Sequence, residues 1–158
     1  MAQKRIYLCH YARNGDAAKE EEDHPPRHWE INIRMSKDVN DPFGKSIGHV
    51  FHVVGSVGNQ WVFKHLENKD YSQTRAWAGC VFVGTVEESK IGEFERVLAS
   101  VPLQPGHPTW NCQNWAWDAL LLLRQQGYNI VLPPTFRRMH ELMEDAKNIG
   151  WDIGTDSD

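Results

Sequence analysis

The chain has little of several features that define common protein classes. It contains three cysteines in 158 residues, an odd number with no Cys-x-x-Cys pair, which argues against a disulfide framework and a cysteine-based zinc site. No apolar run approaches the roughly 20 residues that a membrane span needs. Lys and Arg total 17 against 21 Asp and Glu, and the net charge of −4 argues against a nucleic-acid partner.

The remaining bulk properties are ordinary. Hydrophobic residues make up 41% and charged residues 24% of the chain, as in soluble globular proteins. The apolar run at residues 6–9 is too short for a signal peptide, so we expect none. The length suits one domain, residues 1–158, with its own core. We therefore expect a reduced cytoplasmic protein without stable membrane insertion, metal or other cofactor.

Alternating apolar and polar residues predict strands in the first half of the chain. The clearest strand is 28–34, where His28, Glu30 and Asn32 share one face. The acidic segment 14–27 before it is expected to be a mobile loop, either a lid or a spacer. The segments with a strand pattern are 5–11, 28–34, 47–56, 60–66 and 78–84.

Helices are predicted in the second half. Thr85 and Glu88 fit a capping box, which predicts a helix from there to about Ser100 with Ile91, Phe94, Leu98 and Val101 inward. A second helix should run from Cys112 to Gly127, followed by a short strand at 128–132. A third, capped by Thr135, should end at Gly150, before a frayed tail at 152–158. The result is an α+β fold: a mostly antiparallel sheet of four to six strands with about three helices.

Cys112 is the candidate nucleophile. With Asn111 as the helix N-cap, Cys112 is the first residue of a buried helix, where backbone N–H groups and the helix dipole favour a thiolate. A cysteine nucleophile also needs an imidazole and a group that fixes its tautomer. His28 is the candidate base, and His52, in mid-strand on an otherwise apolar face, is the candidate orienting group. The alternative is that Cys112 is a small buried hydrophobe and both histidines are structural.

The other candidate site residues surround Cys112 and His28. We assign Asn111, Gln113, Trp110 and Trp29 to the pocket and the oxyanion site. His49 and His52 are three residues apart, but on a strand they face opposite sides, so no metal site is predicted.

The segment Asn111-Cys112-Gln113-Asn114-Trp115 resembles the Asn-Cys-x-[His/Asn]-[Phe/Trp] signature of circularly permuted papain-like proteins. Two such groups are the lecithin:retinol acyltransferase-like proteins of the NlpC/P60 superfamily and the PPPDE-type isopeptidases. In the former, a histidine followed by an aromatic residue opens a strand, as His28-Trp29 does, and a second histidine lies on the next strand, which His52 matches. The resemblance implies a permuted papain-like fold with a cysteine–histidine site.

Over nearly its whole length the chain also resembles a family of small proteins of filamentous fungi. They share the order of a His-Trp strand, a His-Val-Val-Gly strand, a Pro-rich loop and a Trp-Asn-Cys helix, but that resemblance implies no activity. The chain departs from the acyltransferase-like pattern because Gln113-Asn114-Trp115 replaces Glu/Asn-His-Phe. It also shows no C-terminal membrane anchor, which several of those proteins have.

The sequence thus predicts a thiol-dependent acyl-transfer enzyme, a hydrolase or acyltransferase acting on an ester, thioester or amide. Its substrate would be a small molecule or a peptide. Two alternatives stay open: a non-catalytic ligand- or protein-binding module on the same fold, and a small-molecule tailoring enzyme, such as a cyclase, that works without covalent catalysis. The tailoring enzyme would need His28 but not Cys112. The binding module would have an ordinary, unreactive Cys112 and a pocket with no histidine near the sulfur.

Overall fold

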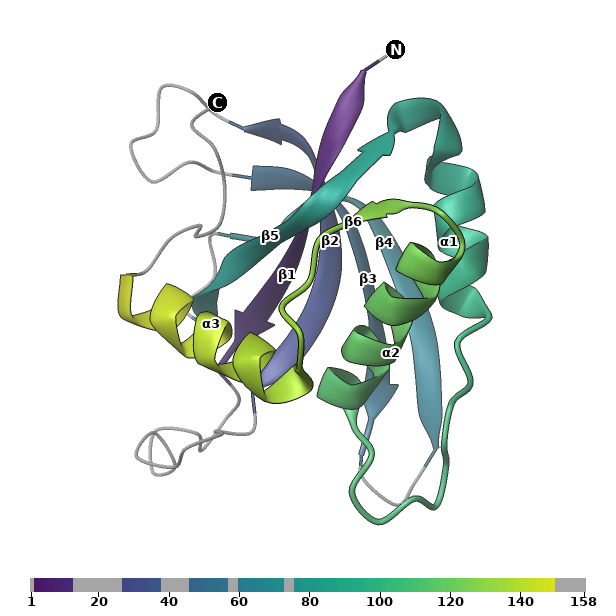
Figure 1. Ribbon diagram of the computed structural model, residues 1–158, viewed down its shortest axis with the longest axis vertical. Helices are drawn as coiled ribbons and strands as arrows, with labels where there is room; N and C mark the ends of the chain where they lie inside the picture. Colours follow the sequence, from purple (N-terminus) through teal and green to yellow (C-terminus); the bar gives the residue numbers. More distant parts are fainter. Residues whose placement is uncertain (1, 13–26, 38–45, 57–59, 73–75, 150–158) are drawn as a thin grey trace.

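The computed structural model describes residues 2–12, 27–37, 46–56, 60–72 and 76–149, with side chains up to residue 146. Within these residues, six strands and three α-helices form one α+β domain, which confirms the predicted fold class (Figure 1). The expected acidic loop, apart from Arg27, and the expected frayed tail lie outside the described residues.

The strands form one sheet in the order β4-β3-β2-β1-β5-β6, and every neighbouring pair is antiparallel. The four predicted strands before residue 70 are all present, and the strand predicted at 78–84 begins one residue earlier and runs three residues further. The strands are β1 (Gln3–Tyr11), β2 (His28–Lys37), β3 (Ser46–Gly55), β4 (Trp61–Asp70), β5 (Trp77–Glu87) and β6 (Asn129–Ile130).

Three helices, α1 (Ile91–Ala99), α2 (Cys112–Gln125) and α3 (Phe136–Ile149), cover one face of the sheet (Figure 1). The main core lies between these two layers and includes Ile31, Ile33, Phe51, Val83, Phe94, Trp115, Leu120 and Met143. Gly79 lets α3 approach β5 closely, because a Cβ there would lie 2.9 Å from the carbonyl oxygen of Ala146. None of the helices in the described part of the chain is long and apolar enough to cross a membrane.

The capping box predicted at Thr85 is wrong. Strand β5 continues to Glu87, and Thr85 pairs with Arg5 of β1 and with Asn129 of β6. Its hydroxyl accepts a hydrogen bond of 2.7 Å from Asn129 Nδ2. Pairing on both sides satisfies the backbone there, so the helix starts later, after a 3₁₀ turn at Glu88–Lys90. The four residues predicted to face inward on this helix are nevertheless buried.

The other helix ends lie close to the positions predicted from the sequence. α2 ends at Gln125, and Gly127 follows with a φ of 93°, the left-handed conformation that terminates many helices. Thr135 caps α3, since its Oγ1 accepts from the backbone N–H of Arg138 at 3.1 Å. The strand expected at 128–132 is shorter, because only Asn129 and Ile130 pair with β5.

The other face of the sheet carries a smaller apolar cluster of Tyr7, Cys9, Val50, Tyr71 and Cys80. Strand alternation places the polar residues of β2 on this face. Because Ile31 of β2 pairs with Phe51 of β3, the register brings Glu30 opposite His52. His28 is the first residue of β2, so its ring lies at the end of the sheet rather than in the middle.

Candidate active site

The start of α2 positions Cys112. Asn111 is extended, with φ −146°, and its side-chain oxygen accepts from the backbone N–H of Gln113 at 2.8 Å. In return, the side-chain oxygen of Asn114 accepts from the backbone N–H of Asn111 at 3.1 Å. This capping box makes Cys112 the first helical residue, as predicted, with its side chain fully buried.

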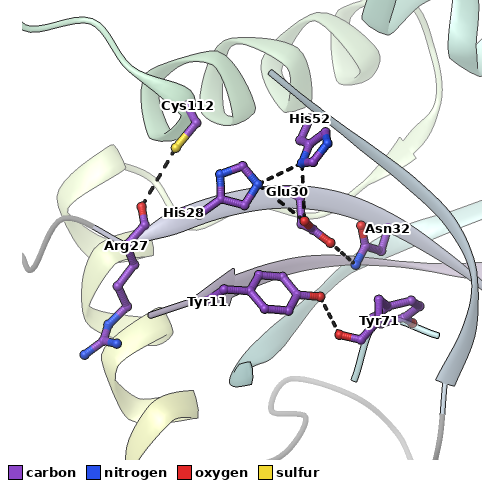
Figure 2. Close-up of polar contacts among 8 residues, drawn as sticks. All are labelled: Tyr11, Arg27, His28, Glu30, Asn32, His52, Tyr71 and Cys112. Carbon is purple, nitrogen blue, oxygen red and sulfur yellow. Dashed lines mark hydrogen bonds and ion pairs between the residues drawn. The ribbon is translucent and has the colours of Figure 1, made fainter. Parts of the chain in front are cut away.

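The carbonyl of Arg27 ties this helix start to the beginning of β2. It accepts a hydrogen bond from Gln113 Nε2 at 3.0 Å. Cys112 Sγ lies 3.8 Å from the same oxygen (Figure 2). The Arg27 side chain is buried and contacts Glu144 of α3, with Nε 3.3 Å from Oε1. Since Arg27 directly precedes His28, these contacts place the sulfur beside the histidine.

His28 lies between the cysteine and a polar cluster. Its ring lies beside Cys112 on one side (Figure 2), close enough for the two side chains to interact electrostatically. On the other side, Nε2 is 2.8 Å from His52 Nδ1 and 3.4 Å from Glu30 Oε1 (Figure 2). The four residues thus form a continuous chain of contacts from the Cys112 sulfur to the His28 ring and on to the pair of His52 and Glu30.

Glu30 is the charged centre of that pair. It is 6% exposed, its Oε1 lies 3.5 Å from His52 Nδ1, and its Oε2 accepts from Asn32 Nδ2 at 2.9 Å. Burial alone would raise its pKa, but hydrogen bonds from His28, His52 and Asn32 lower the pKa to about 2. The carboxylate therefore stays ionised at neutral pH.

The same contacts set the charge of His28. Burial lowers its pKa, but hydrogen bonds to Cys112 and Glu30, together with their charges, outweigh burial and raise the pKa from 6.5 to about 9. His28 is consequently an imidazolium near pH 7. Tyr11 lies beside it, with ring centroids 6.3 Å apart, and donates its hydroxyl to the Tyr71 carbonyl at 2.6 Å. Burial and the charge of Glu30 raise the pKa of Tyr11, which stays neutral.

The structure brings together Cys112, His28 and His52, and it places Gln113 and Asn111 at the same helix start. Both side chains have structural contacts there: Asn111 caps α2, and Gln113 donates a hydrogen bond to the Arg27 carbonyl. The sequence placed Glu30 and Asn32 on the His28 face without giving either a role. The sequence reasoning missed Tyr11, which could be found only from the register of β1 and β2, where Tyr11 pairs with His28.

The two tryptophans assigned to the pocket lie in the core. Trp29 is 1% exposed and packs on Phe136 and His140. Trp110 is 4% exposed, contacts the Trp61 ring and donates from Nε1 to Asp118 Oδ2 at 3.3 Å. Both therefore support the packing behind the site rather than forming an exposed wall.

Two further features bear on ligands. The ligand atoms of His28, Glu30 and His52 lie within 4.8 Å of one another, so these residues form a possible metal-binding set. A hollow of about 650 Å³ lies between β5, β6, α1 and the end of α2, and neither Cys112 nor any histidine lines it.

Replacing Asn111 with alanine is expected to lower the free energy of unfolding by about 1 kcal/mol, because an N-cap acceptor is lost. Asn111→Asp keeps the acceptor and should cost less. Urea unfolding of the three proteins measures the difference. Equal stability of Asn111→Ala and wild type would contradict the role of this cap.

The fold and site define an α+β protein in which a thiol, two imidazoles and a carboxylate meet at the start of a helix. The chain belongs to the family of unknown function DUF6540, whose family model matches residues 17–129. The matched region contains every residue of the cluster and ends before α3. No curated protein and no solved structure matches the chain.

Proposed function

We propose that this protein is a thiol-dependent acyl-transfer enzyme with Cys112 as nucleophile and His28 as general base and acid. The observation that carries the proposal is the position of His28, whose ring contacts Cys112 on one side and both His52 and Glu30 on the other. A nucleophile, a base and a group that orients the base are the three parts of such a site.

In the first step the Cys112 thiolate attacks the carbonyl carbon of an ester, thioester or amide. A bond from sulfur to carbon forms, and the carbonyl electron pair moves onto oxygen. We assign the backbone N–H of Cys112, at the positive end of α2, to this oxyanion. The leaving group then departs with a proton from His28, through Nδ1, because Nε2 faces His52 and Glu30.

In the second step neutral His28 takes a proton from water or an amine. The oxygen or nitrogen so activated bonds to the acyl carbon, and the bond from carbon to sulfur breaks. This restores the thiolate and the protonated histidine. Water as acceptor makes the protein a hydrolase, and an amine makes it an acyltransferase.

Glu30 and His52 act through His28. An ionised carboxylate 3.4 Å from Nε2 stabilises the imidazolium, and His52 fixes the direction of the ring. The order of histidine strand, second histidine strand and cysteine helix also supports a relationship to circularly permuted papain-like proteins. We place the protein in the cytoplasm, where thiols stay reduced.

The test is the rate of alkylation of Cys112 by iodoacetamide as a function of pH, in wild type and in His28→Ala. An ordinary thiol titrates near pH ~8.5, whereas a histidine-paired thiol at a helix start reacts well below pH ~7. We expect fast labelling at low pH in wild type and an ordinary profile in His28→Ala. Peptide mapping assigns the label, and Cys80, buried in β5, is the internal comparison.

Slow labelling with an ordinary pH profile in both proteins would reject the thiolate–imidazolium pair. The alternative function would then stand: a non-catalytic binding module, which the complete burial of Cys112 favours. Because His28, Glu30 and His52 are also possible metal ligands, the assay is repeated after chelator treatment. Labelling that requires added Zn²⁺ would contradict a metal-independent mechanism.

A further inference from the structure

A second histidine cluster lies away from Cys112, where β3 and β4 meet α1. His49 Nδ1 is 2.8 Å from His65 Nε2, and His65 Nδ1 is 2.7 Å from Glu95 Oε2. Ligand atoms of His49, His65 and Glu67 all lie within 4.8 Å of one another. Strand alternation puts His49 and His52 on opposite faces of β3, so the two histidine clusters are separate.

The rings in this cluster are held in place by packing. His65 stacks on Phe51 with ring centroids 4.4 Å apart and 15° between the planes, and His49 stacks on His65 at 5.0 Å. The His65 side chain is only 13% exposed. Two imidazoles are thus fixed with nitrogen atoms facing one another, near an exposed carboxylate, Glu67.

A β-bulge brings Glu67 to this position. Gly48 pairs with Lys69 and Val50 pairs with Leu66, so His49 on β3 faces two residues on β4, Glu67 and Asn68. Asn68 has a φ of 51°, the left-handed conformation, and is alone in this among the described non-glycine residues. Such bulges redirect side chains and occur often beside functional sites.

We propose that His49, His65 and Glu67 form a binding site for a divalent transition-metal ion of the zinc type. Glu95 is a positioning residue: a histidine that binds a metal commonly donates its other ring N–H to a carboxylate, and His65 Nδ1 faces Glu95 in this way. That contact leaves His65 Nε2 as the nitrogen that binds the ion.

The geometry suits such an ion with small adjustments. Zinc–nitrogen bonds of about 2.0 Å in a tetrahedral site separate two ligating nitrogens by roughly 3.3 Å, about half an ångström more than in the hydrogen-bonded pair. Two imidazoles and a carboxylate favour Zn²⁺ or Co²⁺ over Ca²⁺ and Mg²⁺, which prefer oxygen ligands. The proposal does not depend on acyl transfer by Cys112.

The experiment titrates Zn²⁺ into the chelator-treated full chain by calorimetry, and Co²⁺ while recording its visible spectrum. The background is His28→Ala/His52→Ala, which removes the first cluster as a competing site. We expect one ion per chain and a Co²⁺ spectrum without sulfur-to-cobalt charge-transfer bands. His65→Ala should weaken binding by at least ~100-fold, and Glu67→Gln and Glu95→Gln by about 10- to 100-fold.

Glu93→Gln on α1 and Lys64→Gln on β4 are matched controls, since both side chains are exposed, and each should bind the ion like the background protein. Zn²⁺ should also raise Tm in the background protein and raise it less in Glu67→Gln, which alters an exposed side chain and should fold even if His65→Ala does not. No saturable binding, or binding and Tm shifts unchanged by Glu67→Gln and Glu95→Gln, would overturn the proposal. The cluster would then be a structural hydrogen-bond network.

Discussion

Cys112→Ala is expected to reduce turnover of activated acyl substrates by at least ~10³-fold, because the variant has no atom that can form the acyl-enzyme. The probes are p-nitrophenyl esters and acyl thioesters of increasing chain length. Mass spectrometry should detect an acyl adduct on wild type and none on the variant. The fold should persist, since the helix cap at Asn111 and the hydrogen bond from Gln113 to Arg27 do not involve the sulfur.

The matched control is Cys80→Ala, which removes another buried thiol from the opposite face of the sheet and should keep full turnover. Near-ultraviolet circular dichroism checks that both variants fold. Turnover that survives Cys112→Ala would contradict covalent catalysis. If His28→Ala then abolished turnover, the tailoring-enzyme alternative would explain both results.

Glu30→Gln is expected to lower turnover by about 10²- to 10⁴-fold at pH 8, by analogy with loss of the carboxylate in other triads. The carboxylate is one of the groups that raise the pKa of His28 to about 9. An isosteric amide lacks its charge, so the pKa of His28 should fall. The basic limb of the pH–rate profile, near pH 9 in wild type, should therefore move to lower pH.

The same variant should change how stability depends on pH. The raised pKa of His28 contributes stability that is full below pH 6.5 and is lost as pH rises through about 9. The lowered pKa of Glu30 contributes stability that is full above pH 4.5 and is lost as pH falls towards about 2. Glu30→Gln should remove the acid limb and move the alkaline limb to lower pH.

Urea unfolding from about pH 3 to pH 10 measures both limbs. The control is Glu93→Gln, at an exposed position, which should leave them unchanged. An alkaline limb and a pH–rate profile identical to wild type would show that Glu30 does not set the charge of His28.

Local patterns predicted much of the fold, because their physical causes lie within a few residues. Asn111 and Thr135 cap helices through hydrogen bonds two or three residues away. The alternation in 28–34 assigned Trp29 to one face and His28 to the other. The capping box at Thr85 failed because its cause was not local: Thr85 pairs with strands that lie 80 residues before it and 44 after it.

Trp29 and Trp110 show a second limit. Their position close to His28 and Cys112 in the sequence suggested a pocket. Trp110, in the loop before α2, instead packs on Trp61 in the core, and Trp29 follows the rule that neighbours on a strand point to opposite faces. Trp29 therefore enters the core while His28 points to the site. Adjacency in the sequence keeps Trp29 and His28 next to each other along β2, but the pleat of the strand points their side chains in opposite directions.

The sequence by itself determined the α+β class, the polar face of β2 and the place of Cys112 at a helix start, since periodicity and capping act over short distances. Only the tertiary structure decided which groups meet. Glu30 faces His28 and His52, and Tyr11 lies beside His28. His65 of β4 contacts both His49 of β3 and Glu95 of α1. Periodicity assigns a side chain to a face but not to a partner. The partner is determined by strand order, by register and, for Glu67, by the bulge between β3 and β4.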